Sequence, residues 1–329
     1  MGQKRILFIG GTGVISSACV DAALGAGHHV TILNRGESTL RPAPVAARVL
    51  RADIRDTRAV HAAIGDAEFD VVADFLAYTP EHVRADLTLF RDRIGQYIFI
   101  SSASAYQTPP ARLPITESTP LRNPYWQYSR DKIACEELLT TAYRDHGFPA
   151  TIVRPSHTYD RTMVPTMGHW TDISRIRSGR PVVVPGDGTS LWTLTHSADF
   201  AVAFTGLLGR HEAVGDSFHI TADHAATWNQ IYRWLAEATG APVDLVHVPS
   251  DLIARIHPEL GPGLLGDKAH SMVFDNSKVK ALVPAFTTTL SFQRGAEEII
   301  DFHDRHPELQ VFDPRLDAAF DAMVSAVGG

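Results

Sequence analysis

Along the first half of the chain, apolar residues gather in short uninterrupted runs rather than alternating with polar ones. Such runs are typical of strands buried on both faces of a sheet. They predict strands at residues 5–9, 30–33, 48–52, 70–73, 97–100 and 150–153. Between these runs, apolar residues recur at helical spacing. After the predicted N-cap residue Thr79, those expected to face the sheet are Val83, Leu87, Phe90 and Ile94. The alternation of strand and helix predicts an α/β fold with a doubly wound parallel sheet.

Beyond residue 155 the pattern becomes less regular. Strands are predicted at 182–184, 217–221 and 243–248, and helices at 228–238 and 292–303. The Pro/Gly-rich stretch from Pro258 to Gly266 is predicted to be a flexible connection. The last ~25 residues have no assigned place. We therefore expect a sheet domain at 1–155 and a smaller, mixed region at 156–329, some of whose strands and helices return to the sheet.

The composition narrows the class of protein. The chain has 329 residues, of which 44% are hydrophobic, so it can bury a sizeable core. No apolar run approaches the length of a membrane span, and the N-terminus leads directly into a strand without a signal peptide. The formal net charge is −7 and no basic block stands out, which argues against a nucleic-acid partner. Cys19 and Cys135 fall on predicted helices and the 16 histidines are scattered. We expect a cytoplasmic protein without a disulfide or a metal site.

The first predicted strand runs into the turn Gly10-Gly11-Thr12-Gly13-Val14-Ile15-Ser16, which opens a helix. In a strand–turn–helix of this kind, backbone N–H groups and the positive end of the helix bind the pyrophosphate of a dinucleotide. Gly10 permits the tight turn, and Gly13 lets a phosphate approach the backbone. The residues predicted to bind the cofactor here are Gly10, Thr12, Gly13, Val14 and Ile15.

Two further signals follow in the order that hydride-transfer chemistry requires. The strand at 97–100 ends at Ser101-Ser102, and Tyr128 and Lys132 stand one helical turn apart on one face of a helix. A phenol with a lysine one turn later can move a proton while a nicotinamide moves a hydride. Taken singly, each signal has a plain structural alternative, either a surface pair or the cap of a strand end. Their common order favours a catalytic set.

With this order of motifs, the chain resembles the extended short-chain dehydrogenase/reductase family, in the branch that holds the NAD-dependent epimerases and dehydratases. The likeness extends over nearly the whole chain, and the segment 182–196 is similar to a subgroup related to chloroplast stem-loop-binding proteins. The resemblance implies a Rossmann-type NAD(P)-binding domain at 1–155 and a mainly substrate-binding region at 156–329.

The resemblance also implies roles for the catalytic set. Tyr128 would exchange the carbinol proton, Lys132 would bind the nicotinamide ribose, and Ser102 would bind the substrate oxygen. Because a free tyrosine is a poor base at neutral pH, the Lys132 ammonium and the oxidised nicotinamide are expected to lower the pKa of Tyr128.

Further cofactor and substrate contacts come from the same resemblance. Asp53 and Ile54 would contact the adenine, with a helix N-cap as the alternative for Asp53. Pro155, Ser156 and His157 would lie at the nicotinamide amide, with a structural histidine as the alternative for His157. The remaining predicted site residues are Leu76 for the cofactor and Tyr78, Ser104 and Trp192 for the substrate.

The end of the second strand bears on the choice between NAD and NADP. Asn34 and Arg35 stand where NAD-binding relatives often carry an acid that holds the ribose 2′-hydroxyl. The planar fork of an arginine suits a 2′-phosphate, so NADP is favoured over NAD. The alternative for Arg35 is a solvated loop residue.

Two departures from the family pattern bear on the substrate. Trp192 stands where relatives that act on nucleoside-diphosphate sugars place an arginine; a tryptophan stacks on a sugar or base but cannot pair with phosphate. Its alternative is a core position. Ala103 and Ser104 replace the Asp-Glu pair of the sugar 4,6-dehydratases, so that particular elimination is not expected. The substrate is therefore predicted to be sugar-like or nucleoside-like, without a diphosphate.

These features predict an NAD(P)-dependent enzyme that acts on a carbinol or keto carbon, of the epimerase/dehydratase type with transient hydride transfer. One alternative is a net NADPH-dependent ketone reductase of a small metabolite. An alternative from another class is an RNA-binding or regulatory protein with a vestigial cofactor site. The expected partners are the small-molecule substrate and, as an option left open, a second copy of the chain in a homodimer.

Overall fold

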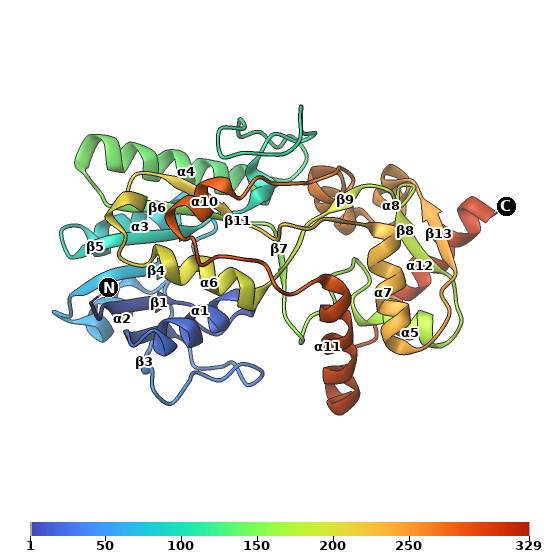
Figure 1. The fold of residues 1–329 in the computed structure, drawn as a ribbon, viewed down its shortest axis with the longest axis horizontal. Coiled ribbons are helices and arrows are strands. Elements are labelled where there is room, and N and C mark those ends of the chain that lie inside the picture. The colour runs from blue at the N-terminus through green and yellow to red at the C-terminus, as the bar shows by residue number, and fades with distance from the viewer. Residues whose placement is uncertain (1, 329) are drawn as a thin grey trace.

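The computed structural model describes residues 2–328 and is built around a seven-stranded sheet in the order β11-β6-β5-β4-β1-β2-β3 (Figure 1). Every neighbouring pair in it runs parallel. The strands are β1 (Arg5–Ile9), β2 (His29–Asn34), β3 (Arg48–Arg51), β4 (Phe69–Asp74), β5 (Ile94–Ile100), β6 (Ala150–Pro155) and β11 (Ser217–Ile220). The strand order reverses beside β1, which is the doubly wound arrangement, so the predicted fold class is confirmed.

Helices cover both faces of this sheet. On one face lie α1 (Val14–Gly25), α6 (Ser197–Leu207) and α10 (Ser277–Leu282); on the other lie α2 (Thr57–Ile64), α3 (Pro80–Phe90) and α4 (Gln127–His146). Successive residues of β1 enter different cores. Phe8 packs in the cluster that contains Phe204 of α6, whereas Leu7 packs in the cluster that contains Val83 of α3 and Leu139 of α4. Burial on both faces explains why the strand sequences are uninterrupted apolar runs.

The helix ends agree with local signals, with one correction. α3 begins after its N-cap Thr79, as predicted, but ends at Phe90, and Ile94 is the first residue of β5. Asp92 takes up a left-handed conformation (φ 57°), which a helix does not continue through. α4 ends at Gly147, whose φ of 68° is the expected helix-terminating conformation.

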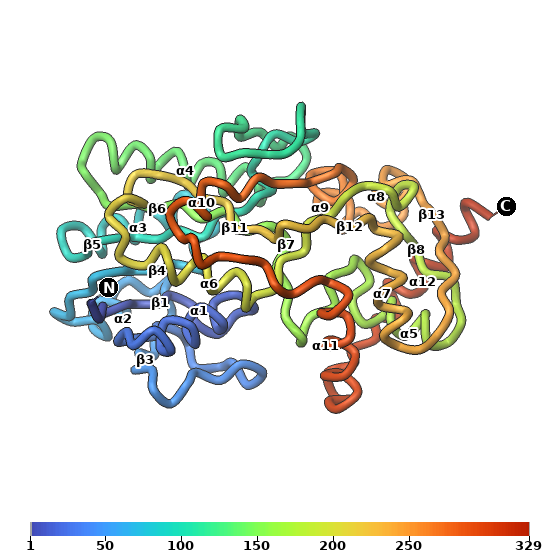
Figure 2. The backbone as a smooth tube through the Cα atoms, in the orientation of Figure 1, coloured from blue at the N-terminus to red at the C-terminus, as the bar shows by residue number. Residues whose placement is uncertain are grey.

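The later half of the chain contributes to both parts of the molecule. Strand β11 pairs with β6 in the sheet, and helices α6 and α10 pack against one of its faces. Figure 2 shows that the chain passes between the two halves of the molecule several times. The other half contains three small strand pairs. They are β7 (His157–Tyr159) with β10 (Leu194–His196), β9 (Leu191–Trp192) with β12 (Ala226–Thr227), and β8 (Val182–Pro185) with β13 (Leu245–Val248). Around them lie α5 (Trp170–Arg177), α7 (Trp228–Thr239), α8 (Ser250–Ile256), α11 (Phe292–Arg305) and α12 (Pro314–Gly328). The division at residue 155 stays a prediction.

Two segments differ from the sequence expectation or extend it. The stretch Pro258–Gly266 is not an irregular connection: it forms consecutive short helical turns, η3 (Pro258–Leu260), α9 (Gly261–Gly263) and η4 (Leu264–Lys268). Leu264 is 1% exposed and anchors these turns in a small core, a contact that the local Pro/Gly content does not reveal. The unassigned C-terminal stretch contains α12, whose Phe320 packs in the same core.

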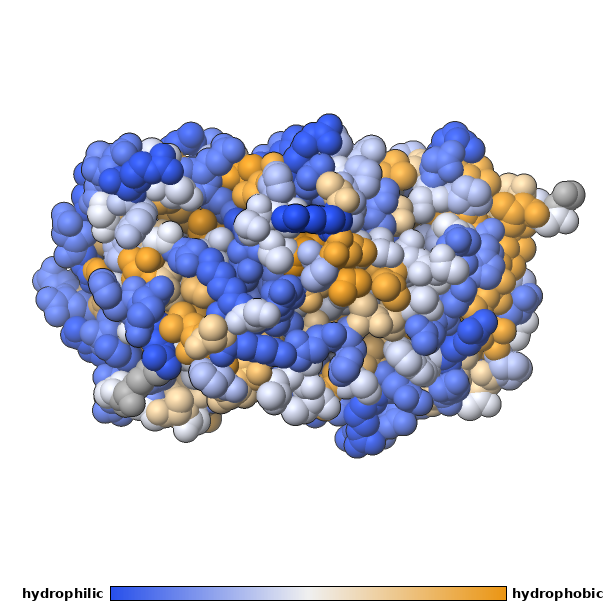
Figure 3. All heavy atoms as spheres, turned by 45° about the horizontal axis from the view of Figure 1, so that its top comes forward, coloured by the Kyte–Doolittle hydropathy of each residue, from blue (hydrophilic) through white to orange (hydrophobic). Residues whose placement is uncertain are grey.

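The face in Figure 3 is largely hydrophilic, with hydrophobic residues gathered near the middle of the molecule and along the right-hand side of the view. Among residues 2–328, no helix is long and apolar enough to cross a membrane. Within the same described range, no cluster of three or more His, Cys, Asp or Glu side chains is arranged to hold a metal ion.

Candidate active site

A single cavity of about 1040 Å³ lies at the carboxyl ends of the central strands and extends toward the second half of the molecule. Every residue that the sequence predicts for the cofactor, the catalytic set and the substrate lines this cavity. They are Gly10, Thr12, Gly13, Val14, Ile15, Asn34, Arg35, Asp53, Ile54, Leu76, Tyr78, Ser102, Ser104, Tyr128, Lys132, Pro155, Ser156, His157 and Trp192. The roles assigned to these residues remain predictions.

The turn between β1 and α1 fits a dinucleotide. Gly10 has φ +84°, and a Cβ there would lie 2.6 Å from Cγ of Leu76, so only glycine is accommodated. Gly13 is the N-cap of α1, and its backbone N–H donates to Oγ of Ser16 at 2.8 Å. Ser16, at the position of the family's third glycine, thus closes the turn instead of widening it. The N–H groups that follow in the first turn of α1 remain directed to the cavity end that a pyrophosphate would occupy.

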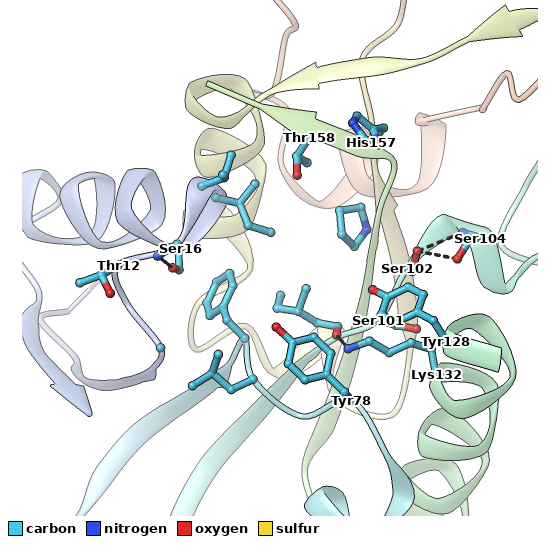
Figure 4. A pocket seen from close by; sticks show the side chains of 18 of the residues that line it. Thr12, Ser16, Tyr78, Ser101, Ser102, Ser104, Tyr128, Lys132, His157 and Thr158 are labelled. Atoms are coloured by element: carbon cyan, nitrogen blue, oxygen red, sulfur yellow. Dashed lines mark hydrogen bonds between the residues drawn. The ribbon is translucent and has the colours of Figure 1, made fainter. Parts of the chain in front are cut away.

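The proposed catalytic residues come together at the other end of the cavity. Figure 4 shows the Tyr128 side chain beside Ser102, with Lys132 reaching past Tyr78. The Lys132 ammonium is buried and donates to the backbone carbonyls of Ala77 at 2.6 Å and Ile100 at 2.7 Å. Ile100 is the last residue of β5 and Ala77 lies in the loop just after β4, so the carboxyl edge of the sheet fixes the position of Lys132.

Burial controls the protonation of this set. Burial lowers the pKa of Lys132 to about 8, opposed by the nearby Asp74 carboxylate. Burial also raises the pKa of Tyr128 to about 12, although hydrogen bonding to Ser102 acts in the opposite direction. The expected lowering of the Tyr128 pKa by Lys132 together with the oxidised nicotinamide stays a prediction for the cofactor-bound protein. The Lys132 ammonium lies 5.7 Å from the Tyr128 ring centre, and it is engaged by carbonyls.

A buried polar network holds α4, the helix that carries Tyr128 and Lys132, against the sheet. Glu136, one turn after Lys132, forms an ion pair with Arg154 of β6 at 2.6 Å and accepts a short hydrogen bond from Ser101. Arg154 also donates to the Tyr106 hydroxyl at 3.1 Å. Because both charges are buried and paired, this network ties α4 to the ends of β5 and β6 in one geometry. Sequence reasoning did not identify it.

Ser104, predicted to contact substrate, is 3% exposed and forms part of the wall. Its hydroxyl lies 2.9 Å from that of Ser102 and 2.7 Å from that of Ser129. Ser104 therefore orients the Ser102 hydroxyl, the group that reaches further into the cavity. Tyr78, in contrast, is 43% exposed and its ring covers the Lys132 ammonium, with 4.8 Å between the nitrogen and the ring centre.

At the adenosine end, Arg35 is exposed and forms an ion pair with Glu37 at 3.1 Å. Asn34 accepts a hydrogen bond from the backbone of Gly36 at 3.0 Å, which shapes the loop after β2. Asp53 accepts from the backbone of Arg55 at 2.9 Å.

The helix-cap alternative for Asp53 is wrong, because the N-cap of α2 is Asp56, which accepts from the backbone N–H groups of Arg58 and Ala59. Arg55 lines the cavity as a second cation at this end, and sequence reasoning missed it.

Around the proposed nicotinamide position, the hydroxyl of Ser156, which lies between β6 and β7, is 2.6 Å from that of Thr195 on β10. Burial, together with the charge of Lys268, lowers the pKa of His157 to about 3, so its ring is neutral. The His157 Nε2 atom has no hydrogen-bond partner among the described residues. The contact of His157 with the nicotinamide amide and its alternative as a structural histidine both stay predictions.

Trp192 lines the cavity but is 3% exposed, and it stacks on Trp228 with 5.5 Å between ring centres. Lys268 lies over it, 5.5 Å from the ring centre, and 5.7 Å from the ring centre of Trp126. Trp192 thus belongs mainly to the core of the second half. Trp126, half-buried and 4.9 Å from the Tyr128 ring, is the aromatic side chain more available to a substrate. Its position two residues before Tyr128 was the signal that could have identified it.

The glycine turn and the reversal of strand order beside β1 are the features of a dinucleotide-binding fold. The sequence model of the NAD-dependent epimerase/dehydratase family matches residues 6–94 and 87–221. The chain belongs to this family, and its predicted membership of the extended short-chain dehydrogenases/reductases is confirmed.

Several individual proteins are similar to this chain in sequence or in structure. A 2′-dehydrokanamycin reductase from Streptomyces kanamyceticus is 30% identical over 291 residues, which are 86% of this chain and 80% of the relative. Chloroplast stem-loop binding protein of 41 kDa b from Arabidopsis thaliana is 28% identical over 258 residues, which are 74% of this chain and 66% of the relative. Among solved structures, an epimerase from Methanothermobacter thermautotrophicus is similar, with a TM-score of 0.77, 17% identity and 94% of each chain covered. The RNA-binding alternative is not favoured by this set of relatives.

Proposed function

We propose that the protein transfers a hydride between a nicotinamide cofactor and a secondary carbinol or ketone of a sugar-like substrate, with Tyr128 as the proton donor and acceptor. The observation that carries this proposal is the convergence of Ser102, Tyr128 and Lys132 at one end of a cavity whose other end is the glycine turn. The membership of the chain in the epimerase/dehydratase family supports it.

Each residue has a separate task in this reaction. The nicotinamide, when bound, accepts or donates the hydride. Ser102 donates a hydrogen bond to the substrate oxygen, and Tyr128 takes the hydroxyl proton during oxidation or returns it during reduction. With a pKa of about 12 before the cofactor binds, Tyr128 is protonated at neutral pH and is ready to donate. With a pKa of about 8, Lys132 is mostly protonated at neutral pH, so it places a positive charge beside this phenol.

NADP is the proposed cofactor. Arg35 and Arg55 both line the adenosine end of the cavity, where a 2′-phosphate would add charge-assisted hydrogen bonds. Glu37 pairs with Arg35 and competes for it, but the pair is exposed and therefore weak. Arg35→Ala should weaken NADP binding by about 1–3 kcal/mol and NAD binding far less. Calorimetry with both cofactors checks this, and equal losses would mean that Arg35 is a solvated loop residue.

Two net reactions start from the same step. A redox-neutral epimerisation or dehydration, in which the hydride returns to the product, is the use that the family supports. A net reduction of a sugar ketone is the second candidate. It is favoured by the similarity to the 2′-dehydrokanamycin reductase from Streptomyces kanamyceticus and by the two arginines at the adenosine end. Whether NADPH is consumed in proportion to product distinguishes them.

The substrate is proposed to lack a diphosphate. Trp192 occupies the position of the family's arginine clamp, and at this end of the cavity the Lys268 cation is adjacent in sequence to the Asp267 carboxylate. The Asp267 carboxylate repels a diphosphate, and this repulsion opposes the attraction that Lys268 would exert on the same dianion.

The function is tested with purified protein, NADP and NAD, and a panel of free sugars, amino sugars and nucleotide-sugars. The proposal expects hydride transfer, followed by the absorbance of the reduced cofactor or by isotope exchange, on members without a diphosphate. The assignment is supported if Tyr128→Phe binds the cofactor but transfers no hydride, whereas the parent protein does both. Turnover of nucleotide-sugars alone would refute the substrate class.

A further inference from the structure

The helical turn η4 (Leu264–Lys268) is held against the cavity by side chains from three other elements. Asn123, before α4, donates to the backbone carbonyl of Gly266 at 2.6 Å. The indole nitrogen of Trp228 on α7 donates to the carbonyl of Lys268 at 3.0 Å. Ser190, before β9, donates to the carbonyl of Ala269 at 3.1 Å. A segment with this many separate restraints is preorganised rather than mobile.

The close approach of this turn to the catalytic helix depends on Gly266. A Cβ at Gly266 would lie 2.9 Å from Cβ of Trp126 and 3.0 Å from Oδ1 of Asn123. Trp126 in turn lies beside Tyr128, with 4.9 Å between ring centres. The residue that follows Gly266 therefore lies in the wall of the cavity, near Tyr128, the proposed acid/base.

That residue is Asp267, and its carboxylate is the uncommitted acid of the site. Other acids near the cavity are occupied: Asp74 accepts from the backbone of Leu76 and Ala77, and Asp160 from Arg41. Within residues 2–328, no hydrogen bond or ion pair engages the Asp267 side chain. Burial raises its pKa to about 6, opposed by the charge of Lys268. Its charge also reaches Tyr128, whose pKa it raises.

We propose that Asp267 is a specificity-determining residue that accepts a hydrogen bond from a hydroxyl or protonated amino group of the substrate, beside the carbon that Tyr128 serves. This inference rests on the proposed function and narrows its substrate class. A ligand that donates a hydrogen bond to a partly buried carboxylate without another donor gains affinity from that bond. An ammonium group makes the bond stronger, because it also carries a positive charge. An anionic substituent at the same place meets like charge in a poorly solvated site and is excluded.

Lys268 does not cancel this preference. Its ammonium lies over the rings of Trp192 and Trp126, and no ion pair joins it to Asp267 among the described residues. The two side chains thus present separate polar positions to a substrate. Sugars that carry hydroxyl or amino groups should be accepted, and sugar acids should be rejected.

The test measures the binding of matched probes to the NADP-loaded protein. The probes are 6-amino-6-deoxyglucose, glucose and glucuronate, which differ only at C6, together with glucosamine, which carries its amine at C2. Each is titrated by calorimetry or by ligand-observed NMR into the parent protein and into Asp267→Asn, which keeps the shape and an acceptor but removes the charge. Asp251→Asn, an exposed acid on the neighbouring α8, is the matched control.

The parent protein and Asp251→Asn should bind at least one amino sugar about tenfold more tightly than glucuronate, and Asp267→Asn should reduce this ratio about tenfold. Glucose affinity should change much less in Asp267→Asn. An unchanged ratio in Asp267→Asn, with NADP and amino sugars still bound, overturns the inference and leaves the proposed function intact. A parent protein that binds NADP but none of these sugars, or that fails to bind NADP, refutes the proposed function and the inference together.

Discussion

Lys132 is positioned by the sheet rather than by its catalytic neighbours. Two backbone carbonyls, one in the loop just after β4 and one at the end of β5, accept from its ammonium, and the Tyr78 ring covers it. Its charge is thereby held at a fixed place beside Tyr128, while burial keeps the phenol protonated. At the scale of single residues, the proposed function therefore requires that cofactor and substrate binding bring about the proton transfer from or to Tyr128.

Replacing Tyr128 by phenylalanine tests this reading directly. The proton transfer occurs only in the transition state, so Tyr128→Phe should lower kcat by about 100-fold or more while NADP affinity stays nearly constant. Steady-state kinetics and cofactor titration give both quantities. Near-parental turnover would assign the proton transfer to another group.

The pH dependence of carbinol oxidation should respond to two neighbours of Tyr128 with opposite signs. Because Tyr128 must lose its proton to act as the base, its pKa sets the limb on which kcat rises with pH. The Asp267 carboxylate raises the pKa of Tyr128, so Asp267→Asn should move this limb to lower pH. Ser102 lowers that pKa through its hydrogen bond, so Ser102→Ala should move the limb to higher pH. Shifts in the same direction would show that the limb does not report Tyr128.

At the scale of elements, the end of the cavity proposed to bind the substrate is formed where three segments meet. The start of α4 brings Trp126, the β9 strand brings Trp192, and η4 brings Lys268 between their two rings. The two tryptophans have different surroundings, because Trp192 is stacked on Trp228 in the core and Trp126 remains half-buried at the cavity. They should therefore affect different properties of the protein.

Paired alanine variants separate these properties. Trp192→Ala removes a large core side chain and should lower the free energy of unfolding by about 3–5 kcal/mol. Trp126→Ala should cost much less stability but weaken the binding of a sugar-like substrate several-fold. Denaturant unfolding and substrate titration on both variants check the assignment, and the reverse pattern would restore Trp192 as the stacking residue.

At the scale of the whole molecule, an ion pair joins the two halves across the cofactor cavity. Arg41, in the loop after β2, pairs with Asp160, just after β7, at 2.8 Å, and both side chains are mostly buried. Burial alone would raise the pKa of Asp160, but hydrogen bonds from Arg41 and Thr162 lower it below its usual range. Ser38 and Thr158, which flank this contact in sequence, both line the cavity. The pair therefore bridges the two walls between which the cofactor would lie.

Breaking this pair should speed cofactor release. Arg41→Gln and Asp160→Asn should each raise the NADP dissociation rate about 5- to 30-fold, because a bidentate, partly buried pair is worth about 1–2 kcal/mol. The double variant should release NADP no faster than the singles, since both remove one interaction. Stopped-flow displacement measures the rates, and Arg84→Gln, which breaks an exposed pair with Glu81, is the control. Additive effects in the double variant would contradict the bridge.

The sequence by itself determined the parts that depend on local periodicity and chemistry. Uninterrupted apolar runs identified the strands of the sheet, the Gly10–Ser16 turn identified the cofactor end, and the spacing of Tyr128 and Lys132 placed both on one helix face. These features are encoded by neighbours a few residues apart, so a local pattern is sufficient to read them.

Only the tertiary structure decided which distant residues share the cavity. Gly266 approaches Trp126 across 140 positions of chain because Asn123 and Trp228 fix the η4 turn, and this contact brings Asp267 to the catalytic end. The same packing buries Trp192 and pairs Arg41 with Asp160. Such contacts depend on how separate elements fill space together, a property that no local stretch of the sequence contains.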